Sequence, residues 1–197
     1  MTPDETLHAI VLAGGASTRF GSVKQLVRIA GRPLLHTVVS RAAEVTGNAL
    51  TVVLGAHAAE LAPLLTHSPG SVVINREWRE GIASSIRAGI ARLPGTCTAA
   101  MLLLADQAAV TAEDLRRLAS GWRRQPTYIA AASYGTTVGV PAIFPRAYFR
   151  DLAELRGDLG ARLLLRRMPD RVVRVRMESA ALDVDTPEDL LALSPQL

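Results

Sequence analysis

The sequence predicts an α/β fold of three layers, in which helices cover both faces of a doubly wound, mostly parallel sheet. Short apolar runs alternate with longer helix-like stretches, as expected when parallel strands are joined by helices. Residues 99–105, AAMLLLA, are wholly apolar, which is typical of a central strand covered on both faces. The chain has 197 residues and is 49% hydrophobic, enough for one sizeable core, so we expect a single domain over residues 1–197.

Strands are expected where a short apolar run is bounded by turn residues or charges. The candidates, in order, are residues 8–13, 49–54, 71–74, 99–105, 127–132 and 171–177. In the last candidate Arg174 and Arg176 alternate with valines. Because successive side chains of a strand point to opposite faces, this predicts a solvated arginine face opposite an apolar one.

Helices are expected between and after these strands. Their predicted starts lie near residues 32–33, 56, 81, 111, 145, 158 and 186. Thr111 offers a capping hydroxyl with acids in the following turn, and Thr186 is followed by a proline and two acids, as is typical of helix N-termini. Asp158 is interpreted as the cap of the helix that follows it.

Composition argues against several classes of protein. The net charge is +4, but aromatic residues make up only 4% and the arginines are spread along the chain, which argues against nucleic-acid binding. No apolar run is long enough for a membrane span, and acidic residues stand where a signal peptide needs basic ones, so we expect a cytoplasmic protein. Cys97 is the only cysteine, which excludes an internal disulfide and favours a buried, inert thiol.

The most informative segment is residues 11–25, VLAGGASTRFGSVKQ. It turns through Gly14 and Gly15 and carries two cations, Arg19 and Lys24. Lys24 is the only lysine of the chain, which indicates a position that needs a compact ammonium rather than a planar guanidinium. Backbone N–H groups of a glycine turn beside cations suit polyphosphate, although the spacing fits neither a Walker A loop nor the dinucleotide fingerprint. The alternative is a strand-to-helix corner in which the glycines only make the bend.

Polar residues stand where several strand candidates end. Asn75 follows residues 71–74, Asp106 follows residues 99–105, and Asp185 precedes the last predicted helix. Ligands of open α/β sheets bind beyond the carboxyl ends of the strands, so these side chains and the glycine loop are expected to converge at one edge. Asp106 is interpreted either as a cap or salt-bridge partner, or as a ligand of Mg2+.

The string from Leu12 to Lys24, LAGGASTRFGSVK, resembles the signature loop of the MobA-like nucleotidyltransferases. Residues 183–189, DVDTPED, and residues 75–85 are similar to two further motifs of that family, so the resemblance spans nearly the whole chain. It implies a Rossmann-like fold of the nucleotide-diphospho-sugar transferase type. It also implies three groups of site residues: catalytic Arg19, Lys24 and Asp106; nucleotide-binding Leu12, Ala13, Gly14, Gly15, Lys24, Asn75 and Ser85; and Mg2+ ligands Asp106 and Asp185.

Within this family the chain is most similar to the branch that attaches a nucleotide to molybdopterin, especially molybdenum cofactor cytidylyltransferase. Residues 157–162, GDLGAR, resemble a feature of that branch which shapes the side that receives the pterin. Two positions depart from the family pattern. Ala108 stands in place of a proline, and Val140 stands in place of a histidine, so no pterin contact by a histidine is expected there.

The resemblance implies transfer of a nucleoside monophosphate from a nucleoside triphosphate to molybdopterin or the molybdenum cofactor, with release of pyrophosphate and a molybdoenzyme as candidate recipient. CTP is favoured because more of the chain resembles the cytidylyl branch. The string LAGG at residues 12–15 is typical of the guanylyl branch and keeps GTP as the alternative. The acceptor could instead be a sugar phosphate, against which the short chain after residue 106 argues. The protein could also be a carrier of molybdopterin without transfer activity.

Overall fold

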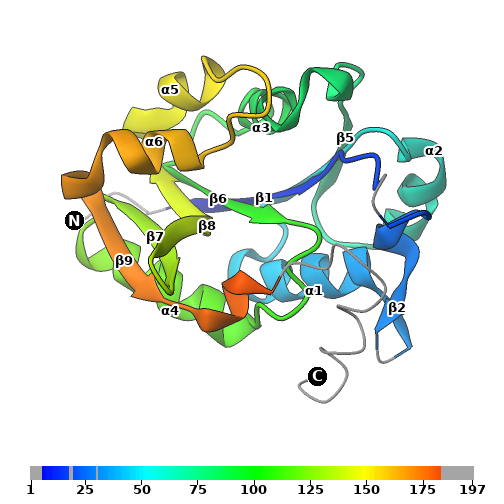
Figure 1. Cartoon of the computed structure of the whole chain (residues 1–197), viewed down its shortest axis with the longest axis horizontal. Coiled ribbons are helices and arrows are strands. Elements are labelled where there is room, and N and C mark those ends of the chain that lie inside the picture. Colours follow the sequence, from blue (N-terminus) through cyan, green and yellow to red (C-terminus); the bar gives the residue numbers. More distant parts are fainter. Residues whose placement is uncertain (1–5, 18–19, 30, 183–197) are drawn as a thin grey trace.

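A seven-stranded sheet forms the middle layer of the molecule (Figure 1). The computed structural model describes residues 6–17, 20–29 and 31–182. In spatial order the strands are β5 (Ser71–Ile74), β4 (Leu50–Leu54), β1 (Leu7–Ala13), β6 (Ala99–Leu104), β8 (Thr137–Pro145), β7 (Ile129–Tyr134) and β9 (Val172–Arg176). The first four are parallel to one another, as β7 is to β9. The predicted fold class is therefore confirmed.

Helices lie on both faces of this sheet (Figure 1). One face is covered by α1 (Leu34–Thr46) and α4 (Ala112–Arg124), and the other by α3 (Ile82–Ile90), α5 (Phe149–Ala153) and α6 (Arg162–Arg167). The remaining short elements are α2 (Ala58–Leu61), the hairpin of β2 (Arg28–Ile29) and β3 (Arg32–Pro33), and the 3-10 turns η1 (Lys24–Leu26), η2 (Ala62–Leu65), η3 (Trp78–Glu80), η4 (Arg146–Tyr148), η5 (Pro169–Arg171) and η6 (Glu178–Ala181).

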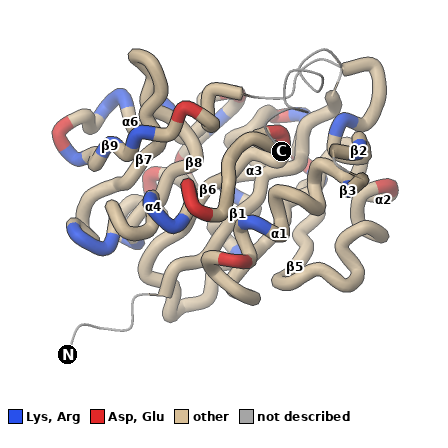
Figure 2. The backbone as a smooth tube through the Cα atoms, turned by 90° about the horizontal axis from the view of Figure 1, so that it is seen from below, with Lys and Arg blue, Asp and Glu red and all other residues tan. Residues whose placement is uncertain are grey.

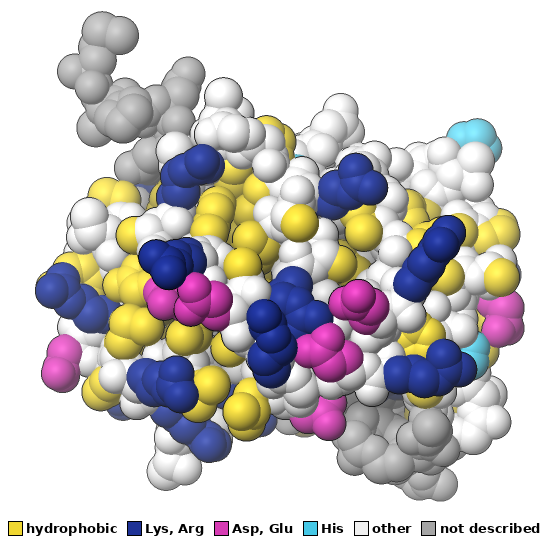
Figure 3. Space-filling view, turned by 90° about the horizontal axis from the view of Figure 1, so that it is seen from above, with side chains coloured by type: hydrophobic (Ala, Val, Ile, Leu, Met, Phe, Trp, Pro, Cys, Tyr) yellow, Lys and Arg dark blue, Asp and Glu magenta, His cyan; other side chains and the backbone are white. Residues whose placement is uncertain are grey.

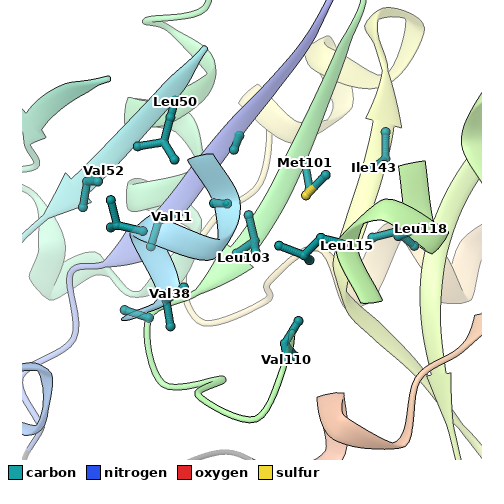
Figure 4. Close-up of a cluster of buried hydrophobic side chains, with 14 of the residues drawn as sticks. Val11, Val38, Leu50, Val52, Met101, Leu103, Val110, Leu115, Leu118 and Ile143 are labelled. Carbon is teal, nitrogen blue, oxygen red and sulfur yellow. The ribbon is translucent and has the colours of Figure 1, made fainter. Parts of the chain in front are cut away.

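The two helical layers create two hydrophobic cores that share the central strands. Val11 of β1 packs into the core on the side of α1 and α4, where it lies near Val38 and Leu103 (Figure 4). The neighbouring residue Ile10 packs into the core on the side of α3. Because successive side chains of β1 enter opposite cores, this strand is apolar throughout rather than alternating. Burial of each such aliphatic side chain contributes about 1.5–3 kcal/mol.

The six predicted strands correspond to β1, β4, β5, β6, β7 and β9, with ends that differ by at most two residues. The sequence does not predict β8, because Gly139 and Pro141 stand within it and such residues argue against a central strand. In the structure β8 runs antiparallel to both β6 and β7. The register with β7 shifts between Ala131 and Ala132, and Pro141 lies outside the registered pairs, so its missing N–H does not interrupt the ladder.

Helix starts agree with the sequence in most places. Thr111 caps α4 through a capping box, in which its Oγ1 accepts from Asp114 N at 3.1 Å and Asp114 Oδ2 accepts from Thr111 N at 3.0 Å. The interpretation of Asp158 as a cap is wrong. Helix α6 begins at Arg162, after Ala161, without a side-chain cap, and Asp158 lies against the backbone of Gly81 instead. The helix predicted near residue 186 lies outside the described residues.

Three smaller predictions can be compared with the structure. Cys97 is buried, as predicted, and burial raises the pKa of its thiol. Arg174 and Arg176 are exposed on β9, while the adjacent valines pack against the core, so the two-faced interpretation of this strand is confirmed. Among the described residues no helix is both long enough and apolar enough to cross a membrane.

Candidate active site

A pocket of about 410 Å³ opens at the edge of the sheet where β1 and β6 end. The register of these strands places Leu12 beside Leu104, and the N–H of Ala105 donates to Leu12 O at 3.0 Å. The loops that follow the two strands therefore leave the sheet at the same level. Seven of the predicted site residues line this pocket: Leu12, Ala13, Gly14, Gly15, Lys24, Ser85 and Asp106. Arg19 and Asp185 lie outside the described residues.

Lys24 and Asp106 form an ion pair inside this pocket, although 82 positions separate them in the sequence. Lys24 Nζ donates to Asp106 Oδ2 at 2.6 Å, and the two side chains are only 13% and 19% exposed. Such shielding from water strengthens a charge–charge interaction relative to a surface pair. The other carboxylate oxygen, Oδ1, is buried and accepts no hydrogen bond from the described residues. A buried oxygen without a donor is unfavourable, so a ligand cation or a ligand donor fits this position.

Gly14 is the point where the loop after β1 packs closely against its neighbours. A Cβ added at this position would lie 2.6 Å from Ser85 Oγ, on α3. The same Cβ would lie 3.9 Å from Gly55 Cα, and Ala56 N donates to Gly14 O at 3.2 Å. Farther along the loop, Gly21 has a φ of +74°, which favours glycine because a side chain would be strained there. The close approach of the chains explains the glycine at position 14, and the positive φ explains the one at 21.

Asn75 lies behind the pocket rather than in its lining. Its side chain is buried, and Nδ2 donates to Ser84 Oγ at 2.8 Å and to Ser85 Oγ at 3.1 Å. Its Oδ1 accepts from Glu77 N at 2.9 Å. The structure thus brings Asn75 and Ser85, both predicted to bind nucleotide, into contact. Asn75 holds the start of α3, and of these two residues Ser85 lines the pocket. Gly81 precedes the helix, and Ser84 Oγ donates back to Gly81 O at 2.8 Å.

A second pocket, of about 360 Å³, adjoins the first and shares Leu12, Ile82, Leu104 and Asp158 with it. Its other walls come from α3, β6, β8, and α6 with the loop before it. They are mostly apolar, and two arginines of α6 complete them: Ile86, Leu102, Val140, Leu159, Gly160, Ala161, Leu163, Arg162 and Arg166. The predicted GDLGAR segment and Val140 therefore meet at one pocket.

Two contacts of the site could not be predicted from the sequence. Arg79 lies over the ring of Trp78, with its guanidinium 4.4 Å from the ring centroid, and both residues line the first pocket. This cation–π contact gives the pocket a flat, positively charged wall. Gln107 is 2% exposed, and its amide donates to Val140 O at 3.0 Å and Ala180 O at 3.3 Å. It ties the turn after β6 to β8 and η6, a link between distant segments that no local pattern reveals.

Charge is not separated into one basic and one acidic side of the molecule. Basic and acidic residues are interspersed along the described backbone (Figure 2). On the face shown in Figure 3, blue and magenta side chains likewise lie next to one another. Arg87, for example, pairs with Glu80 at 2.5 Å. The first pocket is mixed in charge as well, because its described lining holds two cations, Lys24 and Arg79, and two carboxylates, Asp106 and Asp158.

Two of the curated relatives that this chain resembles differ in how much of their own length it covers. Nicotine blue oxidoreductase of Paenarthrobacter nicotinovorans is 30% identical over 196 residues, which cover 93% of this chain and 94% of that protein. Bifunctional protein GlmU of Anaeromyxobacter dehalogenans is 32% identical over 157 residues. That match covers 77% of this chain but 31% of GlmU, so the chain spans about a third of that relative.

A solved structure of similar sequence matches nearly the whole chain. Rv0371c of Mycobacterium tuberculosis H37Rv has a TM-score of 0.82 and 31% identity, covering 97% of this chain and 98% of its own. A manganese complex of that protein has a TM-score of 0.81 and 27% identity, covering 98% of this chain and 100% of its own. A family model, the MobA-like NTP transferase domain, matches residues 9–172. The predicted resemblance is confirmed, and the chain belongs to the MobA-like NTP transferase family.

Proposed function

We propose that this protein transfers a nucleoside monophosphate, preferably CMP, from a nucleoside triphosphate to molybdopterin or the molybdenum cofactor. An oxygen of the acceptor's terminal phosphate forms a bond to the α-phosphorus. The bond from that phosphorus to the oxygen bridging to the β-phosphate breaks, and pyrophosphate leaves. The observation that carries the proposal is the shielded Lys24–Asp106 pair beside the Gly14–Gly15 loop, in a pocket that adjoins a second one.

The residues of the chain align two anions that repel each other and neutralise charge as it develops. The backbone at Gly14 and Gly15 approaches the triphosphate, and Lys24 stabilises the pyrophosphate that leaves. The family motif assigns Arg19 the same task. The hydrogen bonds of Asn75 to the α3 serines support an indirect part in nucleotide binding, in which Asn75 holds Ser85 toward the pocket.

The chemistry of Asp106 fits a divalent ion. Its buried Oδ1 lacks a donor among the described residues, and Mg2+ and Mn2+ prefer carboxylate oxygens. We assign Asp106 and, from the family motif, Asp185 as the residues that hold Mg2+. When bound, the ion neutralises phosphate charge. The manganese complex of the Mycobacterium tuberculosis protein supports a divalent ion in this family.

The second pocket supports an acceptor with a flat ring over a sugar phosphate. Walls such as Ile86, Val140 and Leu163 offer no side-chain hydrogen-bond partners to a sugar's hydroxyl groups, which would lose their water. Arg162 and Arg166 are exposed at this pocket and suit an anionic group. A phosphorylated pterin offers flat ring faces to the apolar walls and a phosphate to the arginines, while the polar edge of its ring stays toward the open side of the pocket. A sugar phosphate stays the alternative acceptor.

The choice of base rests on sequence resemblance. The GDLGAR segment favours the cytidylyl branch, whereas the LAGG string favours the guanylyl branch. The structure offers another reason for glycine at position 14, because a Cβ there would meet Ser85 Oγ. This packing weakens LAGG as an argument for guanine. We therefore retain CTP as the proposed nucleotide and GTP as the alternative.

The test is pyrophosphate release with molybdopterin and Mg2+, comparing CTP, GTP and ATP, with a sugar phosphate as control acceptor. We expect release with CTP and molybdopterin, and its loss in Lys24→Ala but not in Arg92→Ala, an exposed arginine outside both pockets. Release with GTP alone would make GTP the nucleotide substrate in place of CTP. Release with the sugar phosphate alone would make a sugar phosphate the acceptor in place of molybdopterin. A folded protein that binds molybdopterin but releases nothing with any pair would be a carrier.

The relative named nicotine blue oxidoreductase favours a second candidate function, because the identity extends over 93% of this chain. In that case a reduced nicotinamide nucleotide would give hydride to an oxidised dye held in the second pocket, and water would supply the proton. Loss of the dye's absorbance with NADH or NADPH would reveal such a reaction. If that activity needs no divalent ion and survives Asp106→Asn, it is reduction rather than nucleotidyl transfer. We expect no such loss beyond that seen without protein.

A further inference from the structure

We propose that Lys24 makes divalent-ion binding at Asp106 conditional on the nucleotide, because it already neutralises the carboxylate that the ion needs. The inference rests on the proposed function in one respect only: it takes a divalent ion and a polyphosphate as the ligands of the first pocket. It goes further by predicting how strongly each ligand depends on the other, and which residue creates that dependence.

The two oxygens of the Asp106 carboxylate have different surroundings. Oδ2 accepts from Lys24 Nζ at 2.6 Å, while Oδ1 is buried without a donor among the described residues. The turn that carries this carboxylate is held in place, because the adjacent Gln107 donates to Val140 O and Ala180 O. Asp106 therefore offers an ion one oxygen that accepts no hydrogen bond from the described residues, on a carboxylate whose charge Lys24 already compensates.

A divalent ion at Oδ1 and the ammonium at Oδ2 share one carboxylate and repel each other. Little water screens them, since the side chains of Lys24 and Asp106 are 13% and 19% exposed, and charges interact more strongly where water is excluded. The ion pair thus lowers the affinity of Asp106 for a second cation. Lys24→Arg would keep a positive charge beside Asp106 and so keep the repulsion. A test of the proposal must therefore replace Lys24 with an uncharged residue.

Polyphosphate relieves this repulsion. Its oxygens accept charge-assisted hydrogen bonds from Lys24, and they supply further ligands to the oxygen-preferring ion. The nucleotide and the ion then favour each other's binding, and thermodynamic linkage makes the effect reciprocal.

The first measurement is Mn2+ binding to the protein without nucleotide, at constant ionic strength, from the paramagnetic resonance signal of unbound Mn2+. Lys24→Met removes the ammonium and keeps an unbranched side chain. We expect it to bind Mn2+ at least about tenfold more tightly than the parent protein, within the usual range of coupling between sites. Adding Asp106→Asn to Lys24→Met is expected to abolish this gain.

Arg79→Met is the matched control. It also removes one positive charge from the lining of the first pocket, but Arg79 lies over Trp78 and makes no ion pair with Asp106. Since Arg79 is exposed and salt screens exposed charges, we expect less than about a threefold change. Equal or weaker Mn2+ binding in Lys24→Met, or an equal gain in both variants, overturns the proposal.

A second measurement has its decisive outcome in the parent protein, so that outcome does not depend on the folding of a variant. Mn2+ affinity is compared with and without a non-hydrolysable analogue of CTP, and then of GTP, after correction for the ion that the analogue binds in solution. We expect the affinity to rise at least about tenfold, and to rise less in Lys24→Met. No rise with either analogue overturns the proposal.

These readouts separate the inference from the proposed function, because neither requires turnover. A protein that shows the Lys24 effect on Mn2+ but releases no pyrophosphate loses the proposed function and keeps the inference. A protein that releases pyrophosphate but shows equal Mn2+ affinity in Lys24→Met and its parent keeps the function and loses the inference.

Discussion

Lys24 contributes a positive charge to the site, and Gly14, which has no side chain, allows the loop after β1 to pack closely against α3. Both act through contacts with distant residues: Asp106 lies after β6, and Ser85 lies on α3. The sequence singles out both positions, but it does not reveal what each one touches. At this scale the consequences of a substitution depend on those contacts.

Asp106→Asn is expected to lower the turnover of nucleotidyl transfer by about 100-fold or more, the usual loss when one group that stabilises developing charge is removed. The amide keeps the size of the carboxylate but lacks its charge. Pyrophosphate release checks the rate, and circular dichroism checks the fold. Near-normal turnover in both Asp106→Asn and Lys24→Ala would contradict the proposed site.

Gly14→Ala is expected to destabilise the protein by about 1–3 kcal/mol, the usual cost of overpacking. The new Cβ would lie 2.6 Å from Ser85 Oγ but 3.7 Å from Ser85 Cβ. Ser85→Ala should therefore restore part of the loss, and urea unfolding of both single variants and the double variant measures the coupling. If the two losses simply add, the contact does not determine glycine at position 14.

At the scale of elements, the position of the site depends on how the turn after β6 is held. Arg41 of α1 donates to the carbonyls of Ala108 and Val110, and the turn leads into the capping box of α4. Helices on one face thus hold the segment that carries Asp106. The absence of the family's proline at position 108 is compatible with an ordered turn, because these hydrogen bonds restrain it.

Thr111→Ala is expected to lower the free energy of unfolding by about 1 kcal/mol, the typical value of an N-cap. The substitution removes the hydroxyl that accepts from Asp114 N at 3.1 Å. Urea unfolding measures the loss, and Thr127→Ala, at an exposed threonine that caps no helix, is the matched control. Equal losses in the two variants would show that the cap contributes nothing.

At the scale of the whole molecule, the parallel half of the sheet carries a polar contact inside an apolar layer. His8 Nε2 and Thr51 Oγ1 share a hydrogen bond of 2.9 Å, and Thr51 lies 3.2 Å from Ser71 Oγ. These residues link β1, β4 and β5 at the opposite end from the active site. Burial lowers the pKa of His8 below its usual 6.5, so the fold favours the neutral imidazole.

This lowered pKa predicts how stability depends on pH. Below about pH 6.5 the unfolded chain binds a proton at His8 that the folded protein resists, so the free energy of unfolding falls as pH drops from there toward the folded pKa. Above that range the contribution of His8 is constant. Urea unfolding between pH 5 and 8 should show a steeper decline in the parent protein than in His8→Gln. His67→Gln, at an exposed histidine, should keep the parent's slope.

Much of the site could be predicted because its residues belong to local strings. Gly14, Lys24, Ser85 and Asp106 are brought to one pocket as expected, since the carboxyl ends of neighbouring parallel strands meet at one edge. Asn75 is harder to interpret from sequence, because the partner of a buried amide depends on which helix packs above it. The roles assigned to these residues in nucleotide binding, metal binding and catalysis stay predictions.

The sequence by itself determined where six of the seven strands of the main sheet lie along the chain, the apolar character of the central strands and the cap of α4, because hydrophobic periodicity and capping are properties of short windows. Only the tertiary structure decided that β8 enters the sheet antiparallel despite Gly139 and Pro141, and that Asp158 faces Gly81 rather than capping α6. It also paired Lys24 with Asp106. These outcomes depend on register and packing between segments far apart in the chain, which no local pattern encodes.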